Sequence, residues 1–200
     1  MRSSSSRPLA FVLAALLLLF PATPARAGEP LEPMRAQILL MLRILAYDHG
    51  LKERAGDRVT LLVLHHPTDS ASLRRRDELV ASWSGLEKIR VAGIPVAMTT
   101  AALSDPALLA AKVHDLRPAA VIVCPGLERD VPTIRALARS ASMLSFGPTA
   151  AELAQGLAVA IVPDENRFRI LINVAASRAE GVKFDAVLLE LATAVEESSR

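Results

Sequence analysis

Residues 156–194 read GLAVAIVPDENRFRILINVAASRAEGVKFDAVLLELATA, and this stretch decides how the fold ends. Residues 157–162 form an unbroken apolar run, a short polar turn follows, and residues 167–172 alternate polar with apolar side chains. The turn is too short for a crossover helix, so the two runs predict an antiparallel hairpin. Its second strand places Arg167 and Arg169 on one face and apolar residues on the other, which predicts an edge strand with one wet face. Two closing helices follow.

Upstream of this hairpin, predicted strands alternate with predicted helices. Right-handed crossovers of this kind give a mostly parallel sheet with helices on both faces. The predicted fold class is therefore α/β, ending in an antiparallel edge hairpin. We expect strands over residues 59–65, 91–98, 119–124 and 143–146, and helices over residues 34–54, 70–87, 106–116, 131–139 and 149–156.

The first predicted helix carries an unusually wide apolar stripe, over residues 34–45. Such a stripe is typical of a helix that packs between a sheet and a second layer, or of a helix that gives part of its surface to a partner. Both interpretations stay open at this point.

The N-terminus has the pattern of a secretory signal peptide. Arg2 and Arg7 precede an apolar run over residues 9–20, and Ala25-Arg26-Ala27 is a small-x-small cleavage site. The apolar run is shorter than the roughly 20 residues of a membrane-spanning helix. We therefore expect export to the periplasm with cleavage after Ala27, no stable membrane insertion afterwards, and one domain over residues 28–200.

Removing residues 1–27 changes the charge balance. The whole chain has 23 basic and 21 acidic residues, and the signal peptide holds three arginines and no acid, which leaves a formal charge of −1. No basic stripe with interleaved aromatic residues remains, so we expect no nucleic-acid partner. The lone Cys124 excludes an internal disulfide, and its place at the end of an apolar strand predicts a buried thiol.

Candidate ligand residues follow the predicted strands, because ligands of open parallel sheets bind beyond the strands' carboxyl ends. His65 ends the first strand, Gly126 follows the third, and Asn173 follows the last. Adjacent strand residues point to opposite faces, so His65 and His66 do not suggest a metal site. Asn173 most simply caps the next helix, although a helix start can also dock an anion. We name His65, Gly126 and Asn173 as candidate ligand-binding residues.

Signatures of catalysis are missing from the sequence. It has no glycine-rich phosphate loop and no nucleophile elbow, and Cys124 precedes a proline without a local sign of activation. We therefore expect no enzymatic activity, no cofactor and no metal.

Several segments, in order and spacing, resemble the YfiR-like family of exported bacterial proteins, many of unknown function. They are ILAYD at residues 44–48 with Leu51, VIVCPGL at residues 121–127, and residues 156–161, 169–173 and 178–184. The resemblance implies a periplasmic, non-enzymatic regulator with an α/β fold that frequently forms a homodimer. The best-understood member restrains a membrane-embedded diguanylate cyclase and so lowers cyclic di-GMP. Relatives also accompany other sensors, including histidine kinases. That member has disulfides, which this chain cannot form internally.

We therefore expect a periplasmic regulatory protein that modulates an inner-membrane signalling protein, a diguanylate cyclase or a sensor kinase, by protein contact. Its candidate contact residues are Arg167 and Arg169, together with the apolar stripe of residues 34–45. The alternative is a periplasmic small-ligand-binding module that resembles one lobe of a solute-binding protein.

Overall fold

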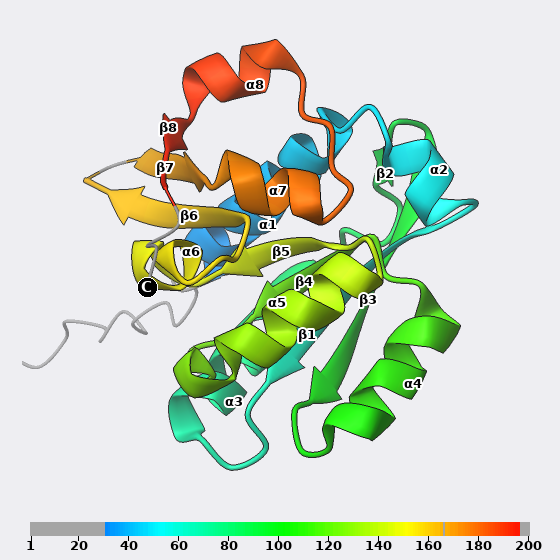
Figure 1. The fold of residues 1–200 in the computed structure, drawn as a ribbon, viewed down its shortest axis with the longest axis vertical. Coiled ribbons are helices and arrows are strands. Elements are labelled where there is room, and N and C mark those ends of the chain that lie inside the picture. Colours follow the sequence, from blue (N-terminus) through cyan, green and yellow to red (C-terminus); the bar gives the residue numbers. More distant parts are fainter. Residues whose placement is uncertain (1–30, 166, 197–200) are drawn as a thin grey trace, which may run out of the picture.

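The computed structural model describes residues 31–165 and 167–196 (Figure 1). The predicted signal peptide over residues 1–27 lies outside the described residues. Within them the strands form one sheet in the order β2-β3-β1-β4-β5-β6-β7-β8. The strands are β1 Val59–His65, β2 Arg90–Val91, β3 Ile94–Ala102, β4 Ala120–Val123, β5 Leu144–Gly147, β6 Val159–Asp164, β7 Arg167–Ile172 and β8 Thr193–Ala194. The helices are α1 Leu31–Ala46, α2 Leu51–Ala55, α3 Ser70–Trp83, α4 Pro106–Leu116, the 3-10 helix Glu128–Asp130, α5 Val131–Ser140, α6 Ala150–Ala154, α7 Val174–Ala179 and α8 Ala186–Leu191.

The sheet has the predicted mixture of strand directions. β3, β1, β4, β5 and β6 run parallel to one another, whereas β2 pairs antiparallel with β3 and β7 pairs antiparallel with β6. The α/β fold class with its antiparallel hairpin is therefore confirmed. One predicted strand, over residues 91–98, is wrong in its boundaries. Ala92 and Gly93 adopt positive φ angles of 50° and 83°, which turns the chain tightly and divides β2 from a longer β3.

Helices cover both faces of the sheet and bury two apolar layers against it. One layer joins α1, α3, α7 and α8 to one face, and the other joins α4, α5 and α6 to the opposite face. Figure 1 shows α5 in front of the sheet and α1 behind it. Alternate residues of β1 divide between these layers, since Leu61 and Val63 belong to the first and Leu62 and Leu64 to the second.

The first predicted helix, over residues 34–54, is two helices. α1 ends at Ala46, and α2 begins at Leu51 after a turn that contains Asp48. The apolar stripe of α1 is mostly sandwiched in the core, since Ile38 and Leu45 are 0% exposed. Leu39, at 42% exposure, and half-buried Leu40 are the stripe residues left near the surface.

Beyond β7 lies a short strand that the sequence did not predict. β8 runs parallel to β7 and pairs with Leu171 and Ile172 only. It leaves the other half of β7, residues 167–170, at the edge of the sheet. The helix α8 contributes buried Leu188 to the core, whereas Leu191 is 71% exposed.

The predicted helix starts are confirmed where they depend on local sequence. The Asp105 carboxylate accepts hydrogen bonds from the backbone N–H groups of Ala107 and Leu108. Thr149 and Glu152 form a capping box at α6. Neither cap requires contacts with distant parts of the chain.

Candidate functional site

The two predicted contact arginines lie on the exposed half of β7. Both are exposed, and between them Phe168 points to the opposite face and is half-buried. Arg167 lies opposite Asp164 in the hairpin, with 3.8 Å between its Nε and the Asp164 Oδ2. Arg169 lies opposite Val162 and makes no ion pair with the part of the chain that the structure describes. The positive charge of Arg169 is therefore available to a partner.

An apolar groove lies on the other face of β7. We call it the α1–β7–α8 groove, and it encloses about 230 Å³. Ile170 connects the groove to the arginine edge, because it lies between Arg169 and the buried end of β7. The fold thus brings the α1 stripe and the β7 arginines, predicted separately, to adjacent surfaces. The residues that line the groove are Leu40, Arg43, Ile44, Tyr47, Ile170, Leu188 and Leu191.

His65 and Gly126 are brought together at the carboxyl ends of the neighbouring strands β1 and β4. His65 is only 6% exposed, and its Nδ1 lies 3.3 Å from the carbonyl oxygen of His66. The N–H of Gly126 donates to the Glu128 carboxylate at 2.8 Å. A Cβ on Gly126 would lie 2.9 Å from the Asp69 carboxyl group, so this loop packs tightly against the start of α3.

Asn173 follows the carboxyl end of β7, which lies beside the amino ends of the parallel strands because β7 runs antiparallel to β6. Its Oδ1 accepts a hydrogen bond from the N–H of Ala176 at 2.9 Å, as expected for a helix cap. Its Nδ2 donates to the carbonyl oxygen of Leu153 at 3.0 Å, and the residue is 1% exposed. The structure therefore does not bring Asn173 together with His65 and Gly126.

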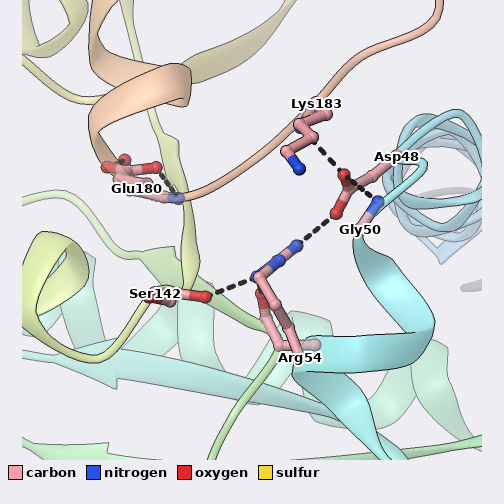
Figure 2. Close-up of polar contacts among 8 residues, drawn as sticks. Asp48, Gly50, Arg54, Ser142, Glu180 and Lys183 are labelled. Atoms are coloured by element: carbon pink, nitrogen blue, oxygen red, sulfur yellow. Dashed lines mark hydrogen bonds and ion pairs between the residues drawn. The ribbon is translucent and has the colours of Figure 1, made fainter.

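A buried ion pair joins distant segments of the chain near the amino ends of the parallel strands (Figure 2). Asp48 is paired with Arg54, and its other oxygen accepts hydrogen bonds from the N–H groups of Gly50 and Lys183 at 3.0 and 2.9 Å. Arg54 also donates to the carbonyl oxygen of Ser142 at 2.5 Å. The pair thus fastens the α1–α2 turn to the chain segments before β5 and after α7, and both carboxylate oxygens of Asp48 have polar partners.

Glu180 is a second buried acid near this pair, and it is 0% exposed. Its carboxylate accepts hydrogen bonds from the Ser145 N–H at 2.8 Å and from the Ser145 hydroxyl at 2.5 Å. Burial raises the pKa of Glu180 to about 7, and the Ser145 hydrogen bonds and the charges of Arg139 and Arg54 oppose that rise. Burial likewise raises the pKa of the Cys124 thiol to about 11, so this cysteine stays protonated and unreactive at neutral pH.

Sequence reasoning assigned no role to Asp48, Arg54 or Glu180. Asp48 and Glu180 do lie in the segments that carry the family resemblance, which is the signal that could have singled them out. Within residues 31–165 and 167–196 no three His, Cys, Asp or Glu side chains are arranged to hold a metal ion.

Residues 98–193 match the model of the family described as YfiR/HmsC-like. This match supports assignment to the YfiR-like family. The matched segment contains Gly126, both β7 arginines, Asn173 and Glu180, while α1 precedes it. No curated protein sequence matches this YfiR-like chain.

Solved structures share the fold of this YfiR-like protein at low sequence identity. A conserved domain protein from Vibrio cholerae has a TM-score of 0.57 at 13% identity, over 81% of this chain and 60% of its own. The ABC domain in complex with L-Trp from Streptococcus pneumonia has a TM-score of 0.51 at 14% identity, over 76% and 62%. The substrate binding protein CD0873 from Clostridium difficile has a TM-score of 0.52 at 13% identity, over 74% and 58%. The chain therefore spans about three fifths of the length of these structures.

No helix among the described residues of this YfiR-like chain is both long and apolar enough to cross a bilayer.

Proposed function

We propose that this YfiR-like protein is a periplasmic, non-enzymatic regulator that modulates an inner-membrane signalling protein by direct contact. The partner is a diguanylate cyclase or a sensor kinase, and the chain reaches the periplasm through cleavage of its signal peptide after Ala27. The family assignment supports a regulatory role. The observation that carries the proposal is the exposed half of β7, where Arg169 adjoins the α1–β7–α8 groove.

This surface has the composition of a protein contact site. Leu191 is 71% exposed, Tyr47 and Ile170 are half-buried, and Arg43 also lines the groove. Arg169 lies next to Ile170 on the opposite face of β7. Aromatic residues and arginines contribute most to the binding energy of many interfaces, and apolar side chains surrounded by polar ones are common at interface centres.

The test is affinity capture from envelope extracts with the full-length, tagged protein. We expect capture of an inner-membrane cyclase or sensor kinase, and we expect Arg169→Glu to weaken that capture without lowering the melting temperature. Arg74→Glu on the exposed surface of α3 is the charge-matched control and should capture normally. Repeated capture that returns no inner-membrane signalling protein would contradict the proposal.

A second candidate function is a small-ligand-binding module. His65 and Gly126 meet at the carboxyl edge of β1 and β4, where ligands of parallel sheets bind, and two similar structures are a domain in complex with L-Trp and a substrate binding protein. A ligand at 100 times its dissociation constant would stabilise the fold by about 2.7 kcal/mol. A thermal-shift screen of amino acids and other metabolites tests this candidate, and a screen without any shift would exclude it.

A further inference from the structure

The ladder between β6 and β7 fixes which backbone groups of β7 face outward. The N–H of Asn173 donates to the carbonyl oxygen of Ala158 at 2.8 Å. Because hydrogen-bonded pairs alternate along an antiparallel ladder, residues 167, 169 and 171 also bond to β6, and residues 168, 170 and 172 face away from it. The N–H of Val195 accordingly donates to the carbonyl oxygen of Ile172 at 2.8 Å, on the outer side.

The short strand β8 covers only part of this outer side. It pairs with Leu171 and Ile172, so the backbone N–H and C=O of Phe168 and the N–H of Ile170 extend beyond its ladder. No described residue forms a ladder with them. An open strand edge of this kind is a template for an added strand.

Side chains on the two faces of this edge define what an added strand must carry. Successive residues of a strand point to opposite faces, so its side chains would alternate between the α1–β7–α8 groove and the arginine face. The groove is lined mainly by leucine, isoleucine and tyrosine side chains, which fit apolar residues. The other face presents Arg167 and Arg169, and acidic residues opposite them stabilise a cross-strand pair.

A second copy of this chain fits the edge poorly. Antiparallel pairing of two β7 edges must align outward-facing residues with each other, so symmetric registers centred on Phe168 or Arg169 place arginine opposite arginine. Like charges directly opposite one another destabilise a strand pair. The charge of the edge therefore favours a different, acidic partner.

We propose that residues 167–170 of β7 bind an extended partner segment by strand addition, and that the segment alternates apolar with acidic side chains. This inference rests on the proposed regulatory function and specifies the chemistry of the partner's contact. Its apolar residues occupy the α1–β7–α8 groove, and its acidic residues lie opposite Arg167 and Arg169.

The experiment uses isotope-labelled full-length protein and a capped hexapeptide that alternates valine with glutamate. NMR measures amide exchange in β7 without peptide and with millimolar peptide, which detects weak binding. In the free protein the amides of Phe168 and Ile170 should exchange faster than those of Arg167 and Arg169, which bond to β6. Peptide should slow the exchange of Phe168 and Ile170 selectively.

Matched peptides and variants separate backbone pairing from charge. Two N-methylated versions of the peptide, each with its backbone N–H groups blocked at alternate residues, should differ in affinity for the protein. Only one of the two sets of N–H groups faces β7 in the added strand. Replacing glutamate with lysine should abolish binding to the wild type. Arg169→Glu should weaken binding of the glutamate peptide about three- to ten-fold. The double variant Arg167→Glu with Arg169→Glu should bind the lysine peptide more tightly than the glutamate peptide. The control Arg74→Glu should bind both peptides with the wild-type affinity.

Three results would overturn the inference. The first is no change in β7 at millimolar peptide, and the second is equal binding of the glutamate and lysine peptides. The third is concentration-dependent protection of Phe168 and Ile170 without peptide, which would assign the edge to a second copy. If peptide binding fails while envelope capture still returns a signalling protein, strand addition is wrong and the regulatory function stands. If peptide binds but capture fails, the regulatory function is wrong.

Discussion

Glu180 is the residue whose chemistry depends most on its surroundings. Its carboxyl group is fully buried, and it contacts Ser145, whose hydroxyl accepts a hydrogen bond from the N–H of Ala158 at 2.8 Å. The carboxyl group therefore connects the end of α7 to the β5–β6 region of the sheet. Protonated, it can donate to the Ser145 hydroxyl while still accepting from the Ser145 N–H. Ionised, it lacks the hydration that an exposed carboxylate would have.

The raised pKa of Glu180 predicts a stability that falls as pH rises. The pKa moves from 4.5 to about 7 in the folded protein, so the folded state holds a proton that the unfolded state has released. The stabilisation is fully present below pH 4.5 and is lost as pH rises through about 7, by on the order of 3 kcal/mol. Urea unfolding at pH 5 and pH 8 should show this loss in the wild type and a smaller loss in Glu180→Gln, whose amide resembles the protonated acid.

Exposed Glu190→Gln is the matched control for this measurement and should retain the wild-type dependence on pH. A Glu180→Gln variant with the same change between pH 5 and pH 8 as the wild type would show that Glu180 is ionised at both values.

The structural role of a single residue was predictable from the sequence where its hydrogen-bond partner is close in the chain. Asn173 bonds to Ala176 three residues away, and this spacing is visible in the sequence. Glu180 and Ser145 are far apart in the chain, and so are Asp48 and Lys183. Only the folded sheet brings such pairs together, and no local pattern distinguishes a buried acid of this kind from a solvated one.

At the scale of elements, the loop after β4 helps to fix the start of α3. The Asp69 carboxylate accepts a hydrogen bond from the N–H of Ser72 at 2.7 Å and caps this helix. Gly126 lies against that carboxyl group and has a φ of 84°. Its lack of a side chain lets the loop and the helix cap occupy the same space.

Gly126→Ala should therefore destabilise the protein by more than its backbone strain alone. Gly93→Ala is the matched control, because Gly93 has a φ of 83° and a Cβ added there would meet no atom within 4 Å. The control should cost about 1 kcal/mol, the usual penalty for alanine in this conformation. Gly126→Ala should cost about 1–2 kcal/mol more, because it also displaces the Asp69 cap. If Gly126→Ala and Gly93→Ala lower the free energy of urea unfolding equally, the Asp69 cap moves without an energetic cost.

Most elements were predictable, and the errors have a common cause. The pattern of apolar residues located α1, but Asp48 breaks the helix by forming contacts with a distant segment. β8 was missed because it is two residues long and exists only through its pairing with β7. The groove beside β7 could not be predicted at all, since it is formed by α1, β7 and α8 together.

At the scale of the whole molecule, the two apolar layers share one sheet. Each long central strand gives alternate side chains to both layers, so loosening one layer removes support from the other. We therefore propose that the described residues form a single cooperative domain, consistent with unfolding in one step.

A core substitution on one face, monitored from the other, tests this cooperativity. Ile134 in α5 is 0% exposed in the α4–α5–α6 layer, whereas the single tryptophan, Trp83, packs against the layer that contains α1 and α3. Ile134→Ala should lower the free energy of unfolding by about 2–5 kcal/mol. In one cooperative domain, Trp83 fluorescence and far-UV circular dichroism must shift to the same new urea midpoint, although Trp83 lies across the sheet from the cavity. Val80→Ala, at a site 47% exposed, should leave both midpoints nearly unchanged. A Trp83 midpoint that stays at the wild-type value while the dichroism midpoint falls would show that the two layers unfold independently.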